Sequence, residues 1–323
     1  MESLYKRNFL NSCLFLGMSL CSFKLLDRYI CNKKKYFCLS KNFYLMGTCG
    51  NITIYVSDVK YGNFVLNEIF LRIKKLEFLF SKFIIDSDVS KLNLNPGIYN
   101  FVSFSVSKLL KLGMYINSNT FGYFDMGLGN LLSSSKIDSV VPFVGRVTGL
   151  QDMKFNLLDI CGNMVKLNRP NSMLDLGGIA KGYTIDLVID FLKECGVKHA
   201  AFEFGGDIKV FGGLPSGKAW KIYLDSKLSY LFNNKNRVFT IVDGSIAVSG
   251  GYFKRSPLFN SKIKHHIIDP STLVSRDYYS ISVVVGESAA ICDALSTACY
   301  NVDDIFCNFI RKNFVDYNIF LYK

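Results

Sequence analysis

The sequence predicts a fold of the α+β class, or a mixed α/β arrangement, because helices and short strands alternate irregularly along it. Residues 52–56 alternate between apolar and polar side chains, which is typical of a strand. Residues 62–83 and 103–118 instead carry apolar side chains at helical spacing. Short β-rich runs and two further helical segments follow in the second half, with no internal repeat along the chain.

The later elements each have a signal of their own. Residues 175–195 begin with glycines, continue with apolar residues at helical spacing and end at Gly196, a common helix stop. Residues 288–300 are a compact, Ala-rich apolar segment that we expect to be a helix. The expected strands are residues 200–211, 220–224, 238–242 and 280–285.

Composition and charge exclude several classes of protein. The 323 residues are 50% hydrophobic, which is enough for one large domain or two moderate ones and excludes a disordered chain. The formal net charge of +12 favours phosphate-bearing ligands, anionic membranes or nucleic acid. No stripe of Lys and Arg interleaved with aromatic residues is present, so we expect no nucleic-acid partner. The 10 cysteines form neither a C-x-x-C pair nor a cluster with histidine, so zinc is not expected.

The N-terminal segment resembles an export signal. Lys6 and Arg7 precede an apolar stretch at residues 9–23, and its length of about 15 residues is less than the ~20 that a membrane-spanning helix needs. Two alternatives stay open, a buried N-terminal helix and a lipid anchor at Cys13. We expect residues 1–40 to be a signal peptide or a membrane-proximal anchor, and the protein to act outside the cytoplasm.

Three loops contain paired glycines, which suits a flat or phosphate-bearing ligand pressed against the main chain. The first, residues 174–183, places Gly177, Gly178 and Lys181 at the start of a helix, where free N–H groups attract phosphate. It matches neither G-x-G-x-x-G nor a P-loop, so an ordinary glycine turn remains an alternative. The other two loops are residues 204–207 and 249–251.

Two further segments carry chemically useful side chains. Asp293 and Thr297 are four residues apart on an expected helix, so both oxygens project from one face, as a magnesium site requires. The alternative is a buried carboxylate that caps local N–H groups. Of the adjacent His265 and His266, we favour His266 as the functional one because it directly precedes the Ile-Ile-Asp-Pro run, although such histidines are usually structural.

Together these segments resemble the ApbE family, the FAD:protein FMN transferases. Asp175 to Tyr183 matches the family's D-L-G-G-I-A-K-G-Y motif residue for residue. The other matching segments are residues 46–48 (M-G-T), 80–93, 122–125 (G-A-F-D), 204–207 (L-G-G-D), 248–250 (T-S-G), 266–270 (H-I-I-D-P) and 293–297 (D-A-L-A-T). They occur in the family's order and cover most of the chain, from about Met46 to Tyr300.

The resemblance implies an ApbE-like, T-fold-like domain at residues 41–323, with two subdomains flanking an FAD cleft. The implied FAD contacts are Met46, Phe83, Tyr123, Phe124, Asp125, Asp175, Lys181, Ile267 and Ile268. The Gly178 carbonyl, Asp293 and Thr297 are the implied ligands of Mg²⁺, and Asp293 and His266 the implied catalytic residues. FAD would be the substrate, and its FMN half would pass to a Thr or Ser hydroxyl of an acceptor protein, a subunit of a membrane redox complex, with release of AMP.

Four positions, in three segments, depart from the family pattern. The family's P-T after F-D is Met126-Gly127, the threonine of T-S-G is Val248, and the tyrosine near the first motif is Phe83. An aromatic ring at residue 83 can still stack, but its hydroxyl is absent. Two alternatives therefore remain beside the transferase: an FAD pyrophosphatase that gives FMN and AMP, and an FAD-binding protein without turnover.

Overall fold

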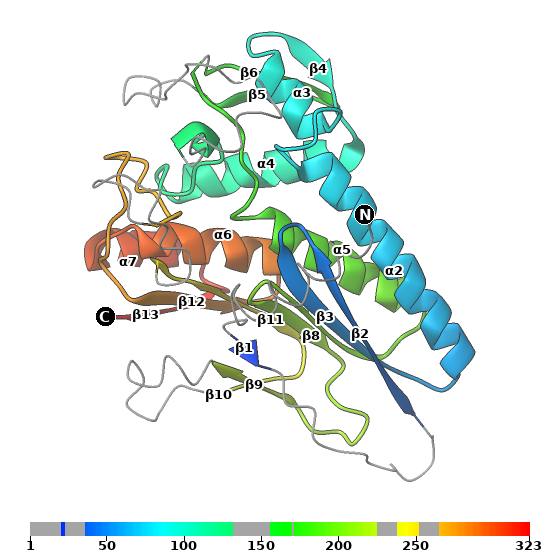
Figure 1. Cartoon of the computed structure of the whole chain (residues 1–323). Helices are drawn as coiled ribbons and strands as arrows, with labels where there is room; N and C mark the ends of the chain where they lie inside the picture. The colour runs from blue at the N-terminus through cyan, green and yellow to red at the C-terminus, as the bar shows by residue number, and fades with distance from the viewer. Residues whose placement is uncertain (1–20, 23–35, 132–155, 170, 225–237, 252–264) are drawn as a thin grey trace, which may run out of the picture.

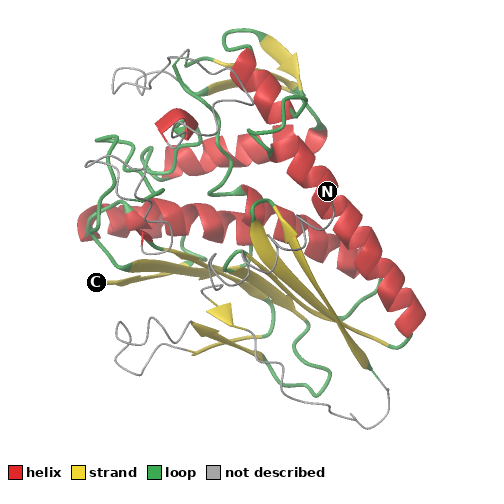
Figure 2. Ribbon diagram, viewed as in Figure 1, coloured by secondary structure: helices red, strands yellow, loops and turns green. Residues whose placement is uncertain are grey.

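The computed structural model describes residues 21–22, 36–131, 156–169, 171–224, 238–251 and 265–323 (Figure 1). Of the expected signal or anchor segment at residues 1–40, only residues 21–22 and 36–40 lie within these ranges. Within them, no helix is both long and apolar enough to cross a membrane. The α+β class is confirmed: helices and antiparallel sheets form separate layers (Figure 2).

The centre of the molecule is a seven-stranded sheet in the order β13-β12-β11-β8-β7-β3-β2, and every neighbouring pair in it is antiparallel. Its strands are β2 (Phe37–Leu45), β3 (Thr48–Val56), β7 (His199–Phe204), β8 (Asp207–Phe211), β11 (Gly244–Ser249), β12 (Ile281–Gly286) and β13 (Asn318–Tyr322). β3 lies beside β7, with Gly50 opposite Phe204. The sheet therefore joins segments that are far apart in the sequence.

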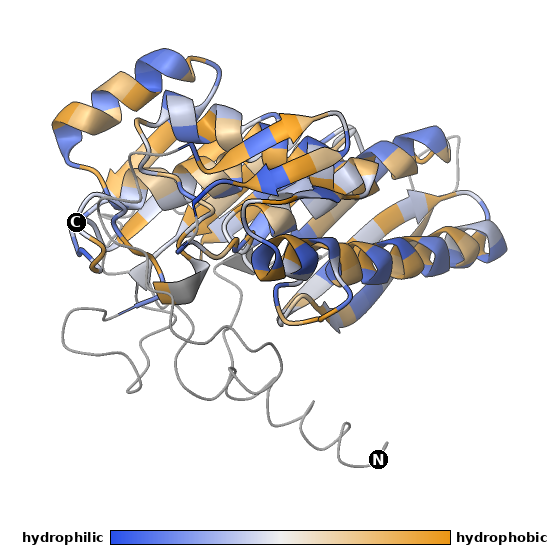
Figure 3. Cartoon of the chain, turned by 90° about the horizontal axis from the view of Figure 1, so that it is seen from above, coloured by the Kyte–Doolittle hydropathy of each residue, from blue (hydrophilic) through white to orange (hydrophobic). Residues whose placement is uncertain are grey.

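Helices cover one face of this sheet (Figure 1). They are α2 (Val59–Phe80), α5 (Ala180–Glu194), α6 (Ala289–Tyr300) and α7 (Asp304–Asn313). α2 begins where the Asp58 carboxylate accepts hydrogen bonds from the N–H groups of Lys60 and Tyr61. The helices carry alternating hydrophilic and hydrophobic bands (Figure 3), and the hydrophobic side chains of α2 and α5 pack on β2, β3 and β7.

The opposite face of the sheet packs against a smaller one in the order β1-β9-β10. Its strands are β1 (Cys21–Ser22), β9 (Trp220–Leu224) and β10 (Val238–Ile241). Trp220, the single tryptophan, is buried here, and its ring centroid lies 6.1 Å from that of Tyr55 on β3. This second core closes the side of the sheet that faces away from the helices.

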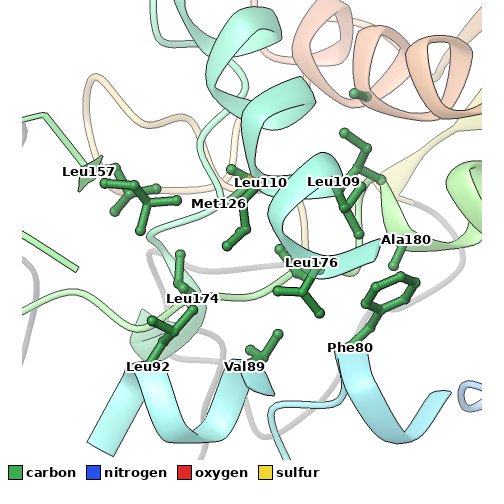
Figure 4. Close-up of a cluster of buried hydrophobic side chains, with 14 of the residues drawn as sticks. Phe80, Val89, Leu92, Leu109, Leu110, Met126, Leu157, Leu174, Leu176 and Ala180 are labelled. Atoms are coloured by element: carbon green, nitrogen blue, oxygen red, sulfur yellow. The ribbon is translucent and has the colours of Figure 1, made fainter. Parts of the chain in front are cut away.

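A third layer lies on the far side of the helices. It contains α3 (Asp88–Leu94), α4 (Phe104–Asn119), the 3₁₀ turn η1 (Gly129–Leu131) and a sheet of β4 (Tyr99–Phe101), β6 (Met164–Leu167) and β5 (Leu158–Cys161). Its core continues into α5 and α6 through Ala180, Ala290, Ala294 and Ala298 (Figure 4). The other side of α6 packs on the main sheet through Cys292, Leu295 and Cys299. Small residues let α6 be buried on both sides, which explains its Ala-rich sequence.

The predicted helices and strands are present, with shifted ends. The expected helix at 62–83 is α2, which ends at Phe80, and the expected strand at 200–211 is divided into β7 and β8 by Gly205 and Gly206, both with positive φ. β2 begins at Phe37, so the expected domain boundary at residue 41 falls inside a strand of the central sheet. The elements that the sequence did not predict are β1, β2, β4, β5, β6, β11, β13, α3 and α7.

Candidate functional site

Two buried carboxylates and one ammonium group meet where α5, β8 and α6 come together. Lys181 Nζ lies 3.2 Å from Asp293 Oδ2 and 3.4 Å from Asp207 Oδ2. It also donates a hydrogen bond of 3.1 Å to the carbonyl oxygen of Gly177. Asp207 and Asp293 are each 3% exposed. We call Lys181, Asp207 and Asp293 the charged cluster.

Glycines allow this approach. A β-carbon at Gly205, in the β7–β8 turn, would stand 3.0 Å from Lys181 Cδ. A β-carbon at Gly182 would stand 2.2 Å from the carbonyl oxygen of Ala289, so α5 and α6 cross in close contact there. We expected Gly182 to bring the main chain close to a ligand; it instead packs against α6, and its N–H donates to Asp293 Oδ2 at 3.2 Å.

Burial shifts the pKa values of the groups in the charged cluster. Desolvation raises the pKa of Asp207 well above its usual range, and the neighbouring Asp293 raises it further against the opposing effect of Lys181. Burial alone would lower the pKa of Lys181, but Asp293 and Asp207 together hold it above its ordinary value. Lys181 therefore stays charged at neutral pH, and the two carboxylates create a strong demand for positive charge.

Oxygen donors suited to a hard cation surround Asp293. Thr297 lies one helical turn further along α6, and a β-carbon at Gly178 would stand 3.4 Å from Thr297 Oγ1. Ser249 Oγ lies 3.3 Å from the same hydroxyl and 2.7 Å from Ser296 Oγ. The structure thus brings Gly178, Asp293 and Thr297 together. Across the described part of the chain no three His, Cys, Asp or Glu side chains are grouped to hold a metal, so a cation here would also need neutral oxygens as ligands.

Asp293 is deeply placed. Its side chain is buried between α5 and α6, where it accepts a hydrogen bond from the N–H of Gly182. The reason is the double burial of α6, which leaves no solvent-facing position in its middle turn. Replacing Asp293 should therefore affect the stability of the fold.

The loop before α5 is tied to the end of α2 by a second ion pair. Lys82 Nζ lies 2.8 Å from Asp175 Oδ2 and donates to the Gly129 carbonyl oxygen at 3.2 Å. Lys82 is 7% exposed. Asp175 also accepts a hydrogen bond from the N–H of Gly177, which fixes the glycine turn. Phe83 beside it is 46% exposed, so its ring is accessible to a ligand.

Tyr123, Phe124 and Asp125 differ in their exposure and in the contacts they make. Tyr123 is half-buried against Phe306 of α7, with ring centroids 5.3 Å apart, and burial raises its pKa. Phe124 is buried, and its ring edge approaches Gly178. The Asp125 carboxylate lies 2.6 Å from Arg169 Nη1 in a buried ion pair. Asp125 is thus engaged by the protein itself, and it shapes the loop that holds Tyr123 and Phe124.

Met46 connects the helix layer to the main sheet at the β2–β3 turn. It has a positive φ of 49°, and its N–H donates to Glu77 Oε1 of α2 at 2.6 Å. The hydroxyl of Thr184 on α5 donates to its sulfur at 3.8 Å. Met46 is half-buried and belongs to the packing between α2 and α5, one turn of α5 away from Lys181.

The two histidines have different surroundings. His265 is fully buried, its Nε2 lies 3.2 Å from Asp277 Oδ1, and its ring packs on Tyr300. His266 is half-buried. Ile267 and Ile268 are 4% and 6% exposed, so their side chains belong to the core of this loop.

The same loop is anchored at the C-terminal end of α6. Asn301, which follows α6, donates to the Ile268 carbonyl oxygen at 2.9 Å. The loop therefore lies at the C-terminal end of the helix that carries Asp293 and Thr297.

Two polar residues of this region were not predicted as site residues. Asp207 had one signal, its place directly after a glycine pair at the end of a β-rich run. Lys82 had none, because its partner Asp175 is distant in the sequence. Both act through pairs that only the tertiary fold creates.

Comparisons with known proteins agree with this geometry. The family model described as the ApbE family matches residues 46–314. The chain belongs to the ApbE family. Among solved ApbE structures, the flavin transferase ApbE of Vibrio cholerae has a TM-score of 0.70 and 22% identity over 89% of this chain and 97% of its own. The ApbE protein of Thermotoga maritima has a TM-score of 0.71 and 21% identity over 89% and 94%. These two show the ApbE fold.

Two curated relatives carry the name FAD:protein FMN transferase. The Vibrio cholerae protein is 29% identical over 226 residues, which are 66% of this chain and 65% of that protein. The Chlamydia muridarum protein is 34% identical over 145 residues, 44% of this chain and 43% of its own length. The matched segments therefore span less than two thirds of these ApbE relatives.

Proposed function

We propose that this chain is an FAD:protein FMN transferase, which moves the FMN half of FAD onto a Thr or Ser hydroxyl of an acceptor protein and releases AMP. Membership of the ApbE family and the names of its relatives support this activity. The observation that carries the proposal is the charged cluster, because it joins a glycine-rich helix start to a carboxylate with neighbouring oxygens. A diphosphate needs both a cation and free N–H groups.

In this proposal FAD lies along the loop before α5, with its diphosphate at Gly177, Gly178 and Lys181. Phe83 and Tyr123 offer accessible aromatic rings for the isoalloxazine or adenine. Met46, Phe124, Asp125, Ile267 and Ile268 hold the surrounding loops in place. Asp175 fixes the glycine turn through its pair with Lys82.

The donor set fits Mg²⁺, a hard cation that usually retains waters and substrate phosphates as ligands. Asp293, Thr297 and the Gly178 carbonyl would hold it. When bound, it supplies charge neutralisation for the diphosphate and the departing AMP. Lys181 adds a second positive charge whose position is fixed by Asp207.

The chemical step is one substitution at phosphorus. The acceptor hydroxyl oxygen forms a bond to the FMN phosphorus, and the bond from that phosphorus to the bridging oxygen breaks, so AMP leaves with the electron pair. The hydroxyl proton must be removed during attack. His266 is our candidate for accepting it or for orienting the phosphate, since it lies at the end of α6 beyond Thr297.

One incubation tests the proposal against its two rivals. Purified protein is mixed with FAD and Mg²⁺, with and without a Thr-containing acceptor protein, and the products are separated by chromatography and mass spectrometry. FMN attached to the acceptor together with AMP supports the transferase. Free FMN and AMP without acceptor dependence would identify a pyrophosphatase, and unchanged bound FAD a binding protein.

We further propose that the acceptor is a flavoprotein subunit of a membrane redox complex and that this chain works outside the cytoplasm. Lys6, Arg7 and the apolar residues 9–23 support export, by cleavage or by membrane retention. Export would place the enzyme beside acceptor domains on that side of the membrane.

A further inference from the structure

A further ion pair, between Lys209 and Asp186, lies beside the charged cluster and involves the same three elements. Lys209 Nζ on β8 lies 2.6 Å from Asp186 Oδ1 on α5, with side chains 10% and 17% exposed. Asp186 follows Gly182 by four residues on α5, so both face α6. Lys209 follows Asp207 by two residues on β8, so both side chains lie on one face of the strand.

The Asp186 carboxylate caps the start of α6. Its two oxygens accept hydrogen bonds from the N–H groups of Ala289 at 2.9 Å and Ala290 at 3.0 Å, and from the Ser288 hydroxyl at 2.7 Å. Ser288 in turn accepts from the N–H of Ile291 at 3.3 Å. The first turn of α6 contains no acidic residue of its own. Asp186 therefore supplies, from another helix, the negative charge that a helix N-terminus favours.

This cap determines where the charged cluster forms. Asp293 lies one turn after the capped N–H groups, and Gly182, between Lys181 and Asp186, allows the close crossing of the two helices. If the cap is lost, α6 can slide or rotate on α5, and Asp293 and Thr297 move with it. Lys209 neutralises Asp186 and attaches the cap to β8, the strand that carries Asp207.

We propose that Asp186, held by Lys209, is a positioning residue that sets α6 so that Asp293 and Thr297 can bind a divalent cation. This inference rests on the proposed function only for the catalytic role of the cation. Its test measures cation binding itself and needs no turnover. It assigns a role to two residues that touch neither the diphosphate loop nor the oxygen donors.

The variants are Asp186→Asn, which removes the charge and one acceptor, Lys209→Met, which removes the counter-charge, and Lys209→Arg, which retains it. Lys323→Met is the matched control, because Lys323 pairs with Asp304 at 3.2 Å but both are about 70% exposed. Each protein is used as the full chain. Hydrogen exchange of peptides covering residues 286–300 reports the cap, and Mn²⁺ binding without FAD reports the cation site.

We expect Asp186→Asn to speed exchange in the first turn of α6 and to weaken Mn²⁺ binding by about 10- to 100-fold, the range for residues that orient metal ligands. Lys209→Met should act in the same direction. Lys209→Arg should restore Mn²⁺ affinity to within about threefold of the original protein, and Lys323→Met should change neither measurement. In turnover, kcat should fall more than KM for FAD rises, because substrate contacts remain.

Normal exchange and normal Mn²⁺ affinity in folded Asp186→Asn and Lys209→Met would overturn the inference. If Asp186→Asn does not fold, the two Lys209 variants decide. Equal Mn²⁺ affinity in Lys209→Met and Lys209→Arg would also contradict the inference. A third check needs no variant: amides of Ala289 and Ala290 that exchange as fast as in an unstructured peptide would exclude a cap. Original protein that binds Mn²⁺ but transfers no FMN would refute the proposed function alone.

Discussion

At the residue scale, one ammonium group serves two buried carboxyl groups. Burial and the neighbouring Asp293 raise the pKa of Asp207, so a second negative charge in the charged cluster is costly. A divalent cation at Asp293 would reduce that cost. The same argument makes both Asp293 and Lys181 suitable for substitution, because each change has a predictable electrostatic consequence.

Asp293→Asn should abolish Mg²⁺-dependent cleavage of FAD, since it removes the only carboxylate of the proposed ligand set. The buried amide is nearly isosteric, so we expect a loss of stability of about 1–3 kcal/mol and not unfolding. Turnover is measured by AMP release, and folding by circular dichroism. Asp316→Asn, at an exposed carboxylate, is the control. Undiminished turnover in folded Asp293→Asn would remove Asp293 from the mechanism.

Lys181→Ala separates a ligand contact from a structural one. If Lys181 contacts the FAD phosphates, its loss removes a charge-assisted hydrogen bond and weakens FAD binding by about 1.5–3 kcal/mol, or roughly tenfold to a hundredfold. Flavin fluorescence titration at fixed Mg²⁺ measures the dissociation constant, with exposed Lys221→Ala as the control. Equal constants would mean that Lys181 serves only Asp207 and Asp293.

At the element scale, the contact between α5 and α6 depends on a residue without a side chain. Gly182→Ala would place a β-carbon 2.2 Å from the Ala289 carbonyl oxygen and 2.8 Å from Ala290 Cα, both rigid backbone atoms. We expect the free energy of unfolding to fall by about 1–3 kcal/mol, as for other overpacked sites. Urea unfolding measures the change.

Gly113→Ala in α4 is the matched comparison for that prediction. Its β-carbon would meet the sulfur and terminal methyl of Met126, at 2.3 and 2.4 Å, and a methionine side chain can turn away. Alanine at this position also stabilises the helix by up to about 1 kcal/mol relative to glycine, because its helix propensity is higher. If Gly113→Ala lowers the free energy of unfolding as much as Gly182→Ala does, the rigid backbone contact between α5 and α6 is not the cause of the loss.

Sequence patterns predicted the long amphipathic helices because their apolar residues repeat at helical spacing over three or more turns. They did not predict α3, which is short and defined by distant partners: Asn93 exchanges two hydrogen bonds with the backbone of Leu174. β2 was missed because half of its residues face away from the core and are polar. In the site, the predicted residues Lys181 and Asp293 meet in an ion pair, whereas Asp207 and Lys82, which were not predicted, depend on pairs across the fold.

At the scale of the whole molecule, the N-terminal segment should be able to direct export without the folded domain. A reporter phosphatase fused after residue 40 should be active outside the cytoplasm, because Lys6, Arg7 and the apolar residues 9–23 suit an export signal. Replacing Leu14 and Leu16 by Asp should abolish export, since charge in the apolar stretch prevents insertion. The export prediction is contradicted if mass spectrometry of the full-length chain finds intact Met1 on soluble cytoplasmic protein.

The pairing of β3 with β7 also fixes the order in which the protein can assemble. Gly50 and Phe204 face each other across the two strands although about 150 residues separate them. At about 5–20 residues per second, synthesis delivers β7 on the order of ten seconds after β3. Until then, β2 and β3 form a two-stranded hairpin, which is marginally stable at best in water. For those seconds the central sheet cannot close, and this part of the chain stays available to chaperones.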